Sequence, residues 1–166
     1  MKIVDMLFES GLPENRCYFC MPENLKLAEK LVSDERIDFF SFIGSAKIGW
    51  MLRSKLSPGT RCALEHGGMA PTFLTESTDL DTASKLLVKG GFYHAGQVCV
   101  SVQRIFVHKN IFDEFLSIFE KNLKPLKVGN PLDNTTEIGP LIRPSEVERV
   151  QEWVNESVSS GTTLLC

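Results

Sequence analysis

The sequence predicts an α/β fold in which βαβ units build a mainly parallel sheet. Apolar, strand-like runs alternate with longer segments whose apolar residues recur at helical spacing. The run from Ile37 to Ile43 is apolar at nearly every position, which is typical of a parallel strand covered on both faces. The chain shows no internal repeat and no low-complexity tract. Strands separated by helices therefore indicate an α/β protein with parallel strands.

The first part of the chain predicts three helices that alternate with three strands. Apolar residues from Ile3 to Phe8 share one side of the opening helix, and Gly11-Leu12-Pro13 ends it. Pro22 suits the first turn of the second helix. The expected elements are a helix over 1–9, a strand over 16–19, a helix over 22–32, a strand over 37–43, a helix from 44 to about 56, and a strand over 60–64.

The second part of the chain continues the alternation. Its most amphipathic segment runs from Ile111 to Leu123, and a long connection rich in Pro, Gly and Asn follows it. The glycine pair Gly67-Gly68 is the best candidate for a flexible boundary between the two parts. The expected elements are strands over 72–75 and 102–107, helices over 79–93, 111–123 and 145–158, and a strand-like end over 162–166.

The composition is that of a folded protein without a charged partner. Hydrophobic residues make up 43% of the 166 residues and charged residues 23%, so a packed core is expected. The formal net charge is −3 and no Lys/Arg cluster stands out, which argues against a nucleic acid or an anionic membrane as partner. No apolar run approaches the ~20 residues of a membrane helix.

The cytoplasm is the expected location. Asp5 and Glu9 interrupt the first apolar stretch, so the start does not resemble a signal peptide. The five cysteines, at positions 17, 20, 62, 99 and 166, are odd in number and unevenly spaced, which fits reduced thiols. The first residues already form a helix and the last ones stop within an apolar run, so we expect a fragment of a longer protein.

The first candidate site opens the helix that follows the buried strand. Gly44 would let a ligand approach the backbone, Ser45 can cap the helix, and Gly49 follows one turn later. The N–H groups at a helix N-terminus favour a phosphate, as in a dinucleotide. The same residues also suit an ordinary strand-to-helix turn, and the full GxGxxG pattern is absent.

The second candidate is Cys99, which follows the turn residues Gly96-Gln97-Val98. Backbone N–H groups at such a turn would lower the pKa of the thiol and stabilise an oxyanion on a substrate. The alternative is a small buried hydrophobic residue, which is the usual role of a free cysteine.

The third candidate is Glu65, which ends an apolar stretch and precedes His66 and the pair Gly67-Gly68. A carboxylate in an apolar setting has a raised pKa, which suits a general base near neutral pH. The alternative is a surface carboxylate at the end of a strand.

Other polar clusters carry weaker signals. Cys17 and Cys20 have the spacing of a metal or redox pair, but no second pair follows and a strand would turn their thiols to opposite sides. We therefore expect core cysteines and no metal site. His94 lies five residues before Cys99 and is expected to pack or to cap rather than to act on the thiol.

Taken together and in this order, the three candidate segments resemble the aldehyde dehydrogenase superfamily. They read FIGSAKIG, LEHGG and GQVC, and 34 positions separate Glu65 from Cys99. The flanking runs TDLDTA, RIFVH and KVGNPLDNTTEIGPLI agree as well, so the resemblance covers nearly the whole chain. Three departures stand out, namely Ala46 where Thr is frequent, His66 where Leu is usual and His94 where Asn is common.

The resemblance implies a function for each candidate. Cys99 would be the nucleophile that attacks an aldehyde, and Glu65 the base that activates water to release a carboxylic acid. The cofactor would be NAD or NADP, held by residues that include Gly44, Ser45, Gly49 and Gly67. Residues 1–66 would form the C-terminal half of the Rossmann-like cofactor domain, and residues 67–166 the N-terminal part of the catalytic domain.

The resemblance also implies that family segments lie outside this chain. A Pro-Trp-Asn segment and a Lys-Pro-Ser-Glu-type segment would precede Met1, and a Glu-Ile-Phe-Gly-Pro segment would follow Cys166. Full-length family members are homo-oligomers, and their oligomerisation strands would also follow Cys166. A fragment without these segments can be inactive alone. Two other hypotheses therefore stay open: an inactive remnant that serves as a binding or assembly module, and a cofactor-independent thiol esterase.

Overall fold

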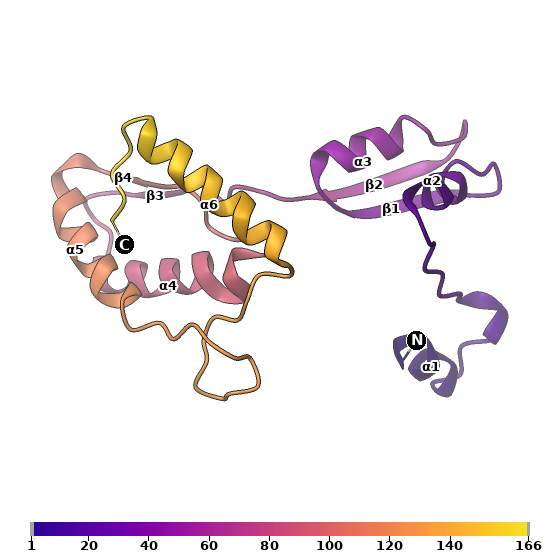
Figure 1. Cartoon of the computed structure of the whole chain (residues 1–166), viewed down its shortest axis with the longest axis horizontal. Helices are drawn as coiled ribbons and strands as arrows, with labels where there is room; N and C mark the ends of the chain where they lie inside the picture. The colour runs from indigo at the N-terminus through magenta and orange to yellow at the C-terminus, as the bar shows by residue number, and fades with distance from the viewer. Residues whose placement is uncertain (1, 166) are drawn as a thin grey trace. The chain divides into compact units, whose positions relative to one another are not determined.

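The computed structural model describes residues 2–165, and the chain divides into two compact units, unit 1 up to His66 and unit 2 from Gly67 onward. Each unit contains a pair of parallel strands joined through a helix, which confirms the predicted α/β class with parallel βαβ units (Figure 1). Within the described residues, no helix has both the length and the apolar composition needed to cross a membrane.

Unit 1 is a two-stranded sheet with helices. Strand β1 pairs in parallel with β2, from Phe39 opposite Arg61 to Gly44 opposite His66. Helix α3 connects the two strands and packs against both of them. The elements of unit 1 are α1 (Lys2–Glu9), a 3-10 helix η1 (Glu14–Arg16), α2 (Leu25–Val32), β1 (Phe39–Gly44), α3 (Ala46–Arg53) and β2 (Arg61–His66).

Burial alternates along β1, so the expectation of a strand covered on both faces is wrong within this chain. Phe39 and Ile43 are 58% and 83% exposed, whereas Phe40 and Phe42 between them are half-buried. Successive side chains of a strand point to opposite faces. The elements of unit 1 therefore cover one face of the strand pair and leave an apolar face open.

The predicted strand over 16–19 is also wrong. The chain forms a 3-10 turn instead, in which the Arg16 amide donates to the Pro13 carbonyl (2.9 Å), and no strand within residues 2–165 pairs with the residues that follow. Cys20 is exposed, so it is not the core cysteine that we expected. The next helix begins at Leu25 rather than Pro22, because the Asn24 side chain caps it by accepting from the Leu27 amide at 3.1 Å.

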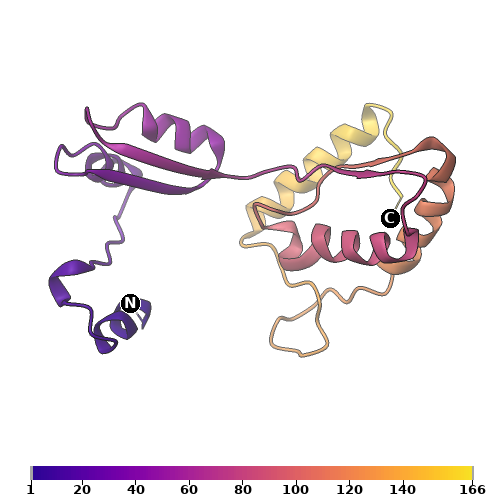
Figure 2. The same cartoon turned by 180° about the vertical axis from the view of Figure 1, so that it is seen from behind.

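Unit 2 has a buried core between its strands and two of its helices. Leu74 from β3, Leu87 from α4 and Phe115 from α5 are 4–6% exposed and pack together. Helices α4 and α5 lie on one side of the β3–β4 pair (Figure 2). The elements are β3 (Thr72–Leu74), α4 (Leu80–Phe92), a 3-10 helix η2 (Tyr93–Gly96), β4 (Ile105–Val107), a 3-10 helix η3 (Lys109–Ile111), α5 (Phe112–Leu123) and α6 (Pro144–Ser159).

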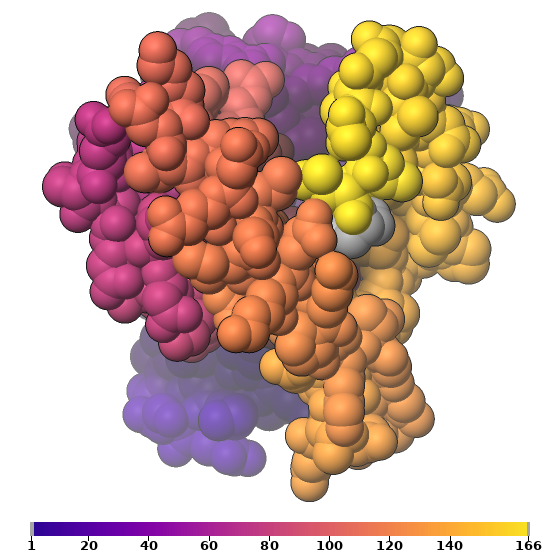
Figure 3. All heavy atoms as spheres, turned by 90° about the vertical axis from the view of Figure 1, so that its left-hand side faces the viewer, coloured from indigo at the N-terminus to yellow at the C-terminus, as the bar shows by residue number. Residues whose placement is uncertain are grey.

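Helix α6 and the chain after it complete unit 2. Pro144 begins α6, as proline favours the first helical position, and Gly161 (φ 95°) follows its end. The chain after α6 lies beside the last part of that helix (Figure 3). Leu164 lines a shallow pocket together with Trp153 and Val158 of α6. Residues 162–165 form no strand, contrary to the expectation from the sequence, and Cys166 lies outside the described residues.

Candidate functional site

Cys99 lies on an exposed turn of unit 2, and its thiol is free. The turn is closed by the Ser101 amide, which donates to the Val98 carbonyl at 3.0 Å. The Cys99 amide donates to no acceptor within residues 2–165. The residue is thus accessible to a substrate, whereas free cysteines are most often packed away from solvent.

The backbone before Cys99 takes an uncommon conformation. His94, Ala95 and Gly96 have φ angles of 50°, 56° and 71°, so three successive residues lie in the left-handed region. This conformation costs roughly 1–2 kcal/mol for each residue that has a Cβ atom. It follows the end of helix α4, where Tyr93 already has extended backbone angles (φ −60°, ψ 146°). Strain of this kind persists only where surrounding contacts hold it.

Hydrogen bonds hold the Cys99 turn on two sides. Ser101 is 2% exposed and its hydroxyl donates to the Gly91 carbonyl at 3.1 Å, near the end of α4. The Gly68 amide donates to the Cys99 carbonyl at 3.1 Å. A Cβ atom on Gly68 would lie 3.0 Å from that carbonyl oxygen, so the close approach favours glycine here. Strand β4 begins later than predicted, because the Val102 amide donates to the Gly90 carbonyl instead of joining the strand.

A third attachment of the turn comes from the Gln97 side chain, which bonds to Pro140 and Ile142. The sequence shows that Gln97 neighbours the nucleophile, but it does not show these partners. They follow more than forty residues later, within a connection that has no periodic pattern, so no local signal could have revealed the contact.

The predicted phosphate-binding turn lies in unit 1, at the start of α3. Ser45 caps the helix, and its hydroxyl accepts from the Ile48 amide at 3.5 Å. The first intrahelical bond is Gly49 N–H to the Ser45 carbonyl at 2.9 Å. The amides of Ala46 and Lys47 precede that bond and have no carbonyl of the helix to bond to. They are the donors that this turn could offer to an anion.

Gly44 and Gly49 are required by packing inside unit 1. A Cβ atom on Gly44 would lie 2.6 Å from the Phe42 ring, and one on Gly49 would lie 2.3 Å from His66 Cε1. The His66 ring fills the space that Gly49 leaves, and it lies near Trp50, with ring centroids 6.1 Å apart. Both ring nitrogens of His66 are buried without a hydrogen-bond partner among the described residues.

Glu65 lies on β2 next to His66, with its side chain exposed. Alternation along the strand places it on the face opposite His66, and its neighbour on β1 is the exposed Ile43. The apolar enclosure that we expected around this carboxylate is therefore not formed by unit 1. Glu65 belongs to unit 1 and Cys99 to unit 2, so their joint action stays a prediction. A Cβ atom on Gly67 would meet no atom within 4 Å, so this glycine lies in open space.

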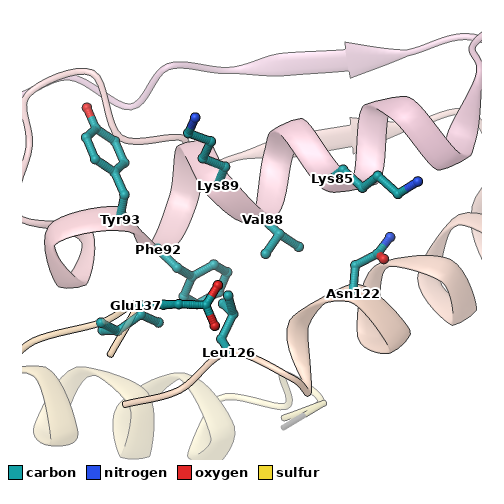
Figure 4. Close-up of a pocket in the computed structure, with 9 residues that line it drawn as sticks. Lys85, Val88, Lys89, Phe92, Tyr93, Asn122, Leu126 and Glu137 are labelled. Carbon is teal, nitrogen blue, oxygen red and sulfur yellow. The ribbon is translucent and has the colours of Figure 1, made fainter. Parts of the chain in front are cut away.

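A separate pocket of unit 2 lies between α4, α5 and residues 126–138 (Figure 4). Val88 and Phe92 point from α4 toward Leu126, while Lys89 points away from it (Figure 4). None of the predicted site residues lines this pocket. The predicted chemistry is therefore assigned to the exposed Cys99 turn and not to this pocket.

Comparisons with known proteins agree on one family. The model of the aldehyde dehydrogenase family matches residues 1–166. A 3-sulfolactaldehyde dehydrogenase of Priestia aryabhattai is 38% identical over 99% of this chain, and a lactaldehyde dehydrogenase of Methanocaldococcus jannaschii is 39% identical over 84% of it. The matches cover 34% and 30% of these relatives, so the chain spans about a third of their length.

Solved structures give the same result. An NADP-dependent glyceraldehyde-3-phosphate dehydrogenase from Bacillus halodurans, complexed with NADP, matches with a TM-score of 0.93 and 26% identity. That match covers 99% of this chain and 34% of the other. An NAD-dependent aldehyde dehydrogenase from Sinorhizobium meliloti matches with a TM-score of 0.95 and 27% identity, over 99% of this chain and 33% of its own.

Proposed function

The chain belongs to the aldehyde dehydrogenase family, and we propose that it supplies the nucleophile and the base for oxidation of an aldehyde to a carboxylic acid with NAD or NADP. The observation that carries the proposal is the exposed, free Cys99 on a turn that several hydrogen bonds hold in place. The relatives and structural neighbours are named as dehydrogenases of aldehydes, which supports the same chemistry.

Cys99 begins the reaction as a thiolate, which is the nucleophilic form of cysteine. Its sulfur would attack the aldehyde carbonyl carbon, so that a C–S bond forms and the carbonyl electron pair moves to oxygen. The Cys99 amide, which donates to no acceptor among the described residues, would be a donor for that oxygen. The loss of one such donor typically slows an enzyme by ~10²–10³. Bound NAD or NADP would supply the hydride acceptor for the oxidation.

Glu65 would then accept a proton from water, so that the hydroxide oxygen attacks the resulting thioester on Cys99. The C–S bond breaks, the acid leaves, and the thiolate is restored. Glu65 precedes Gly68 by three residues, and the Gly68 amide bonds the Cys99 carbonyl. Three residues of chain span at most about 11 Å, so covalent connection alone keeps the Glu65 backbone within that distance of Gly68.

The start of α3 fits the pyrophosphate of a dinucleotide. The amides of Ala46 and Lys47 are available, and Ser45 holds the end of the helix in place. Gly44 has no Cβ atom that could block a ligand at this point. The atoms nearest to the position of such a Cβ atom belong to the Phe42 ring. Ser45 and Gly44 would thus orient the phosphates, Gly49 would support them by letting α3 pack against His66, and Gly67 is proposed as a cofactor residue from the family resemblance alone.

The proposal can be tested on the chain with two substrates. Mass spectrometry would follow acylation by an activated ester such as p-nitrophenyl acetate, and absorbance would follow NAD(P)H formation with an aldehyde. We expect an acyl adduct on Cys99 that disappears in Cys99→Ala. Cys20→Ala is the matched control, because Cys20 is also exposed and free.

The outcomes separate the hypotheses. NAD(P)H formation supports the dehydrogenase proposal for this chain, and ester turnover alone supports a cofactor-independent thiol esterase. A chain that gives neither reaction behaves as a binding or assembly module. An acyl adduct that persists in Cys99→Ala contradicts the assignment of the nucleophile.

A further inference from the structure

The Gln97 side chain bonds to three backbone groups and joins two distant segments of unit 2. Its Nε2 donates to the carbonyl of His94 at 3.0 Å and to that of Pro140 at 3.4 Å. Its Oε1 accepts from the Ile142 amide at 2.9 Å. Both ends of the amide are thus used, one as donor and one as acceptor, and the partners lie 43 and 45 residues further along the chain.

These bonds act on the strained part of the Cys99 turn. Nε2 bonds to His94, which is the first of the three left-handed residues. The Gln97 backbone amide donates to the same carbonyl at 3.1 Å, so both the side chain and the main chain of Gln97 bond to the His94 carbonyl. Residues that are free to relax would leave the left-handed region, since each costs roughly 1–2 kcal/mol there.

At the far end of this attachment, the Ile142 side chain is 81% exposed and contributes little packing, whereas the neighbouring Leu141 is half-buried and lines a pocket with Gly96. The hydrogen bond from the Ile142 backbone amide to Gln97 therefore adds a directional contact to this packing. The connection between α5 and α6 is in this way fastened beside the nucleophile.

We propose that Gln97 is a positioning residue for Cys99, which holds the left-handed turn against Pro140 and Ile142 and so fixes the direction of the Cys99 amide. This inference rests on the proposed function, because it concerns how Cys99 and its N–H meet a carbonyl substrate. The role suits an amide side chain, which offers two N–H donors at Nε2 for the carbonyls of His94 and Pro140 and an acceptor oxygen at Oε1 for the Ile142 amide.

The test compares two reactions of the same thiol in the 166-residue chain. Acylation by p-nitrophenyl acetate needs the thiol and a correctly aimed amide donor, whereas alkylation by iodoacetamide needs only the thiol. Gln97→Met keeps the length of the side chain and removes its hydrogen bonds. Gln97→Glu keeps the acceptor for Ile142 and loses the donor. Gln103→Met is the matched control, because Gln103 is exposed and nearby.

We expect Gln97→Met to slow acylation of Cys99 by about tenfold, since small misplacements of catalytic groups are costly. Alkylation should change by no more than about twofold, because the thiol remains exposed. Amide exchange measured by NMR should be faster at Ile142 in Gln97→Met and unchanged in Gln97→Glu. Gln103→Met should match the unchanged chain in all three measurements.

An equal loss of both reactions, or unchanged acylation, would overturn the positioning role. Unchanged exchange at Ile142 in Gln97→Met would overturn it as well. If the unchanged chain forms no acyl adduct, the proposed function fails, and the exchange at Ile142 still decides whether Gln97 holds the two segments together.

Discussion

Unit 2 is built around buried side chains, whereas unit 1 is built around a strand pair with an open face. Leu74, Leu87 and Phe115 are almost fully covered in unit 2. Among the described residues of unit 1, Leu52 is the one large apolar side chain that is buried, and Phe39 and Ile43 are exposed on β1. A pair of strands alone is marginally stable. The unit with its own core also carries the strained Cys99 turn, because a strained turn needs rigid surroundings.

The largest expected effect is the difference in lost stability between replacing a core aromatic residue and replacing an exposed one. Phe115 is 4% exposed and packs near Phe119, with ring centroids 5.4 Å apart. Phe115→Ala should lower the free energy of unfolding of unit 2 by about 3–5 kcal/mol, through lost burial and the cavity left behind. Phe39→Ala, in unit 1, should change stability by no more than about 0.5 kcal/mol.

Amide exchange of α4 and α5, compared with that of β1 and β2, measures both variants in the intact chain. A loss of similar size for Phe39→Ala would mean that the open face of β1 is covered in solution. The difference between the units would then be smaller than the burial of these residues indicates.

A smaller effect is expected at the tightest contact of unit 1. Gly49→Ala would bring a Cβ atom to 2.3 Å from His66 Cε1, which the strand and helix cannot both accommodate without a shift. We expect unit 1 to lose about 1–3 kcal/mol. Gly67→Ala is the matched control for stability, since no atom lies within 4 Å of that position.

A double-mutant cycle identifies the cause of that loss. When His66 is changed to Ala as well, the cost of Gly49→Ala should fall but not vanish, because the His66 ring is gone while Phe42 Cδ1 still lies 3.0 Å from the added Cβ atom. Amide exchange of β1 and β2 provides the measurement. An equal cost of Gly49→Ala in both backgrounds would show that His66 is not the obstacle.

The smallest effect concerns the pH dependence of the helix caps in the two units. Asp79 caps α4, and the hydroxyl and backbone amide of Thr82 that bond to it lower the pKa of its carboxyl below the ordinary 3.8. Ser45 caps α3 without a titratable group. A lowered pKa in the folded state means that the stabilisation is present above the ordinary pKa and is lost as the pH falls through the lowered value.

Acid should therefore weaken α4 through its cap, and not α3. Asp79→Asn keeps a capping oxygen but does not titrate, so its melting temperature should fall less than that of the unchanged chain between about pH 5 and about pH 2. Circular dichroism at a series of pH values measures this. Parallel acid profiles for the two proteins would exclude Asp79 as the source.

Elements whose cause is local could be predicted from the sequence, and elements that need a distant partner could not. Asp79 and Ser45 indicate in the sequence where their helices begin, because a capping side chain acts within three residues. The strand expected over 16–19 fails because a strand requires a neighbour to bond to, and unit 1 offers none to these residues. The sequence placed Glu65 at a strand end and left both an apolar setting and a surface position open; the structure gives the exposed position, which depends on what lies across the sheet.

The sequence by itself determined the family of this chain and the alternation of parallel strands and helices, and it is the source of the proposal that Cys99 and Glu65 act as nucleophile and base, because motif order and residue type are properties of the chain alone. The tertiary structure decided how Cys99 is held: the left-handed run before it, the Gly68 amide on its carbonyl, and Gln97 bonded to Pro140 and Ile142. Those contacts join residues that are distant along the chain, and their energies exist only once folding has brought the segments together.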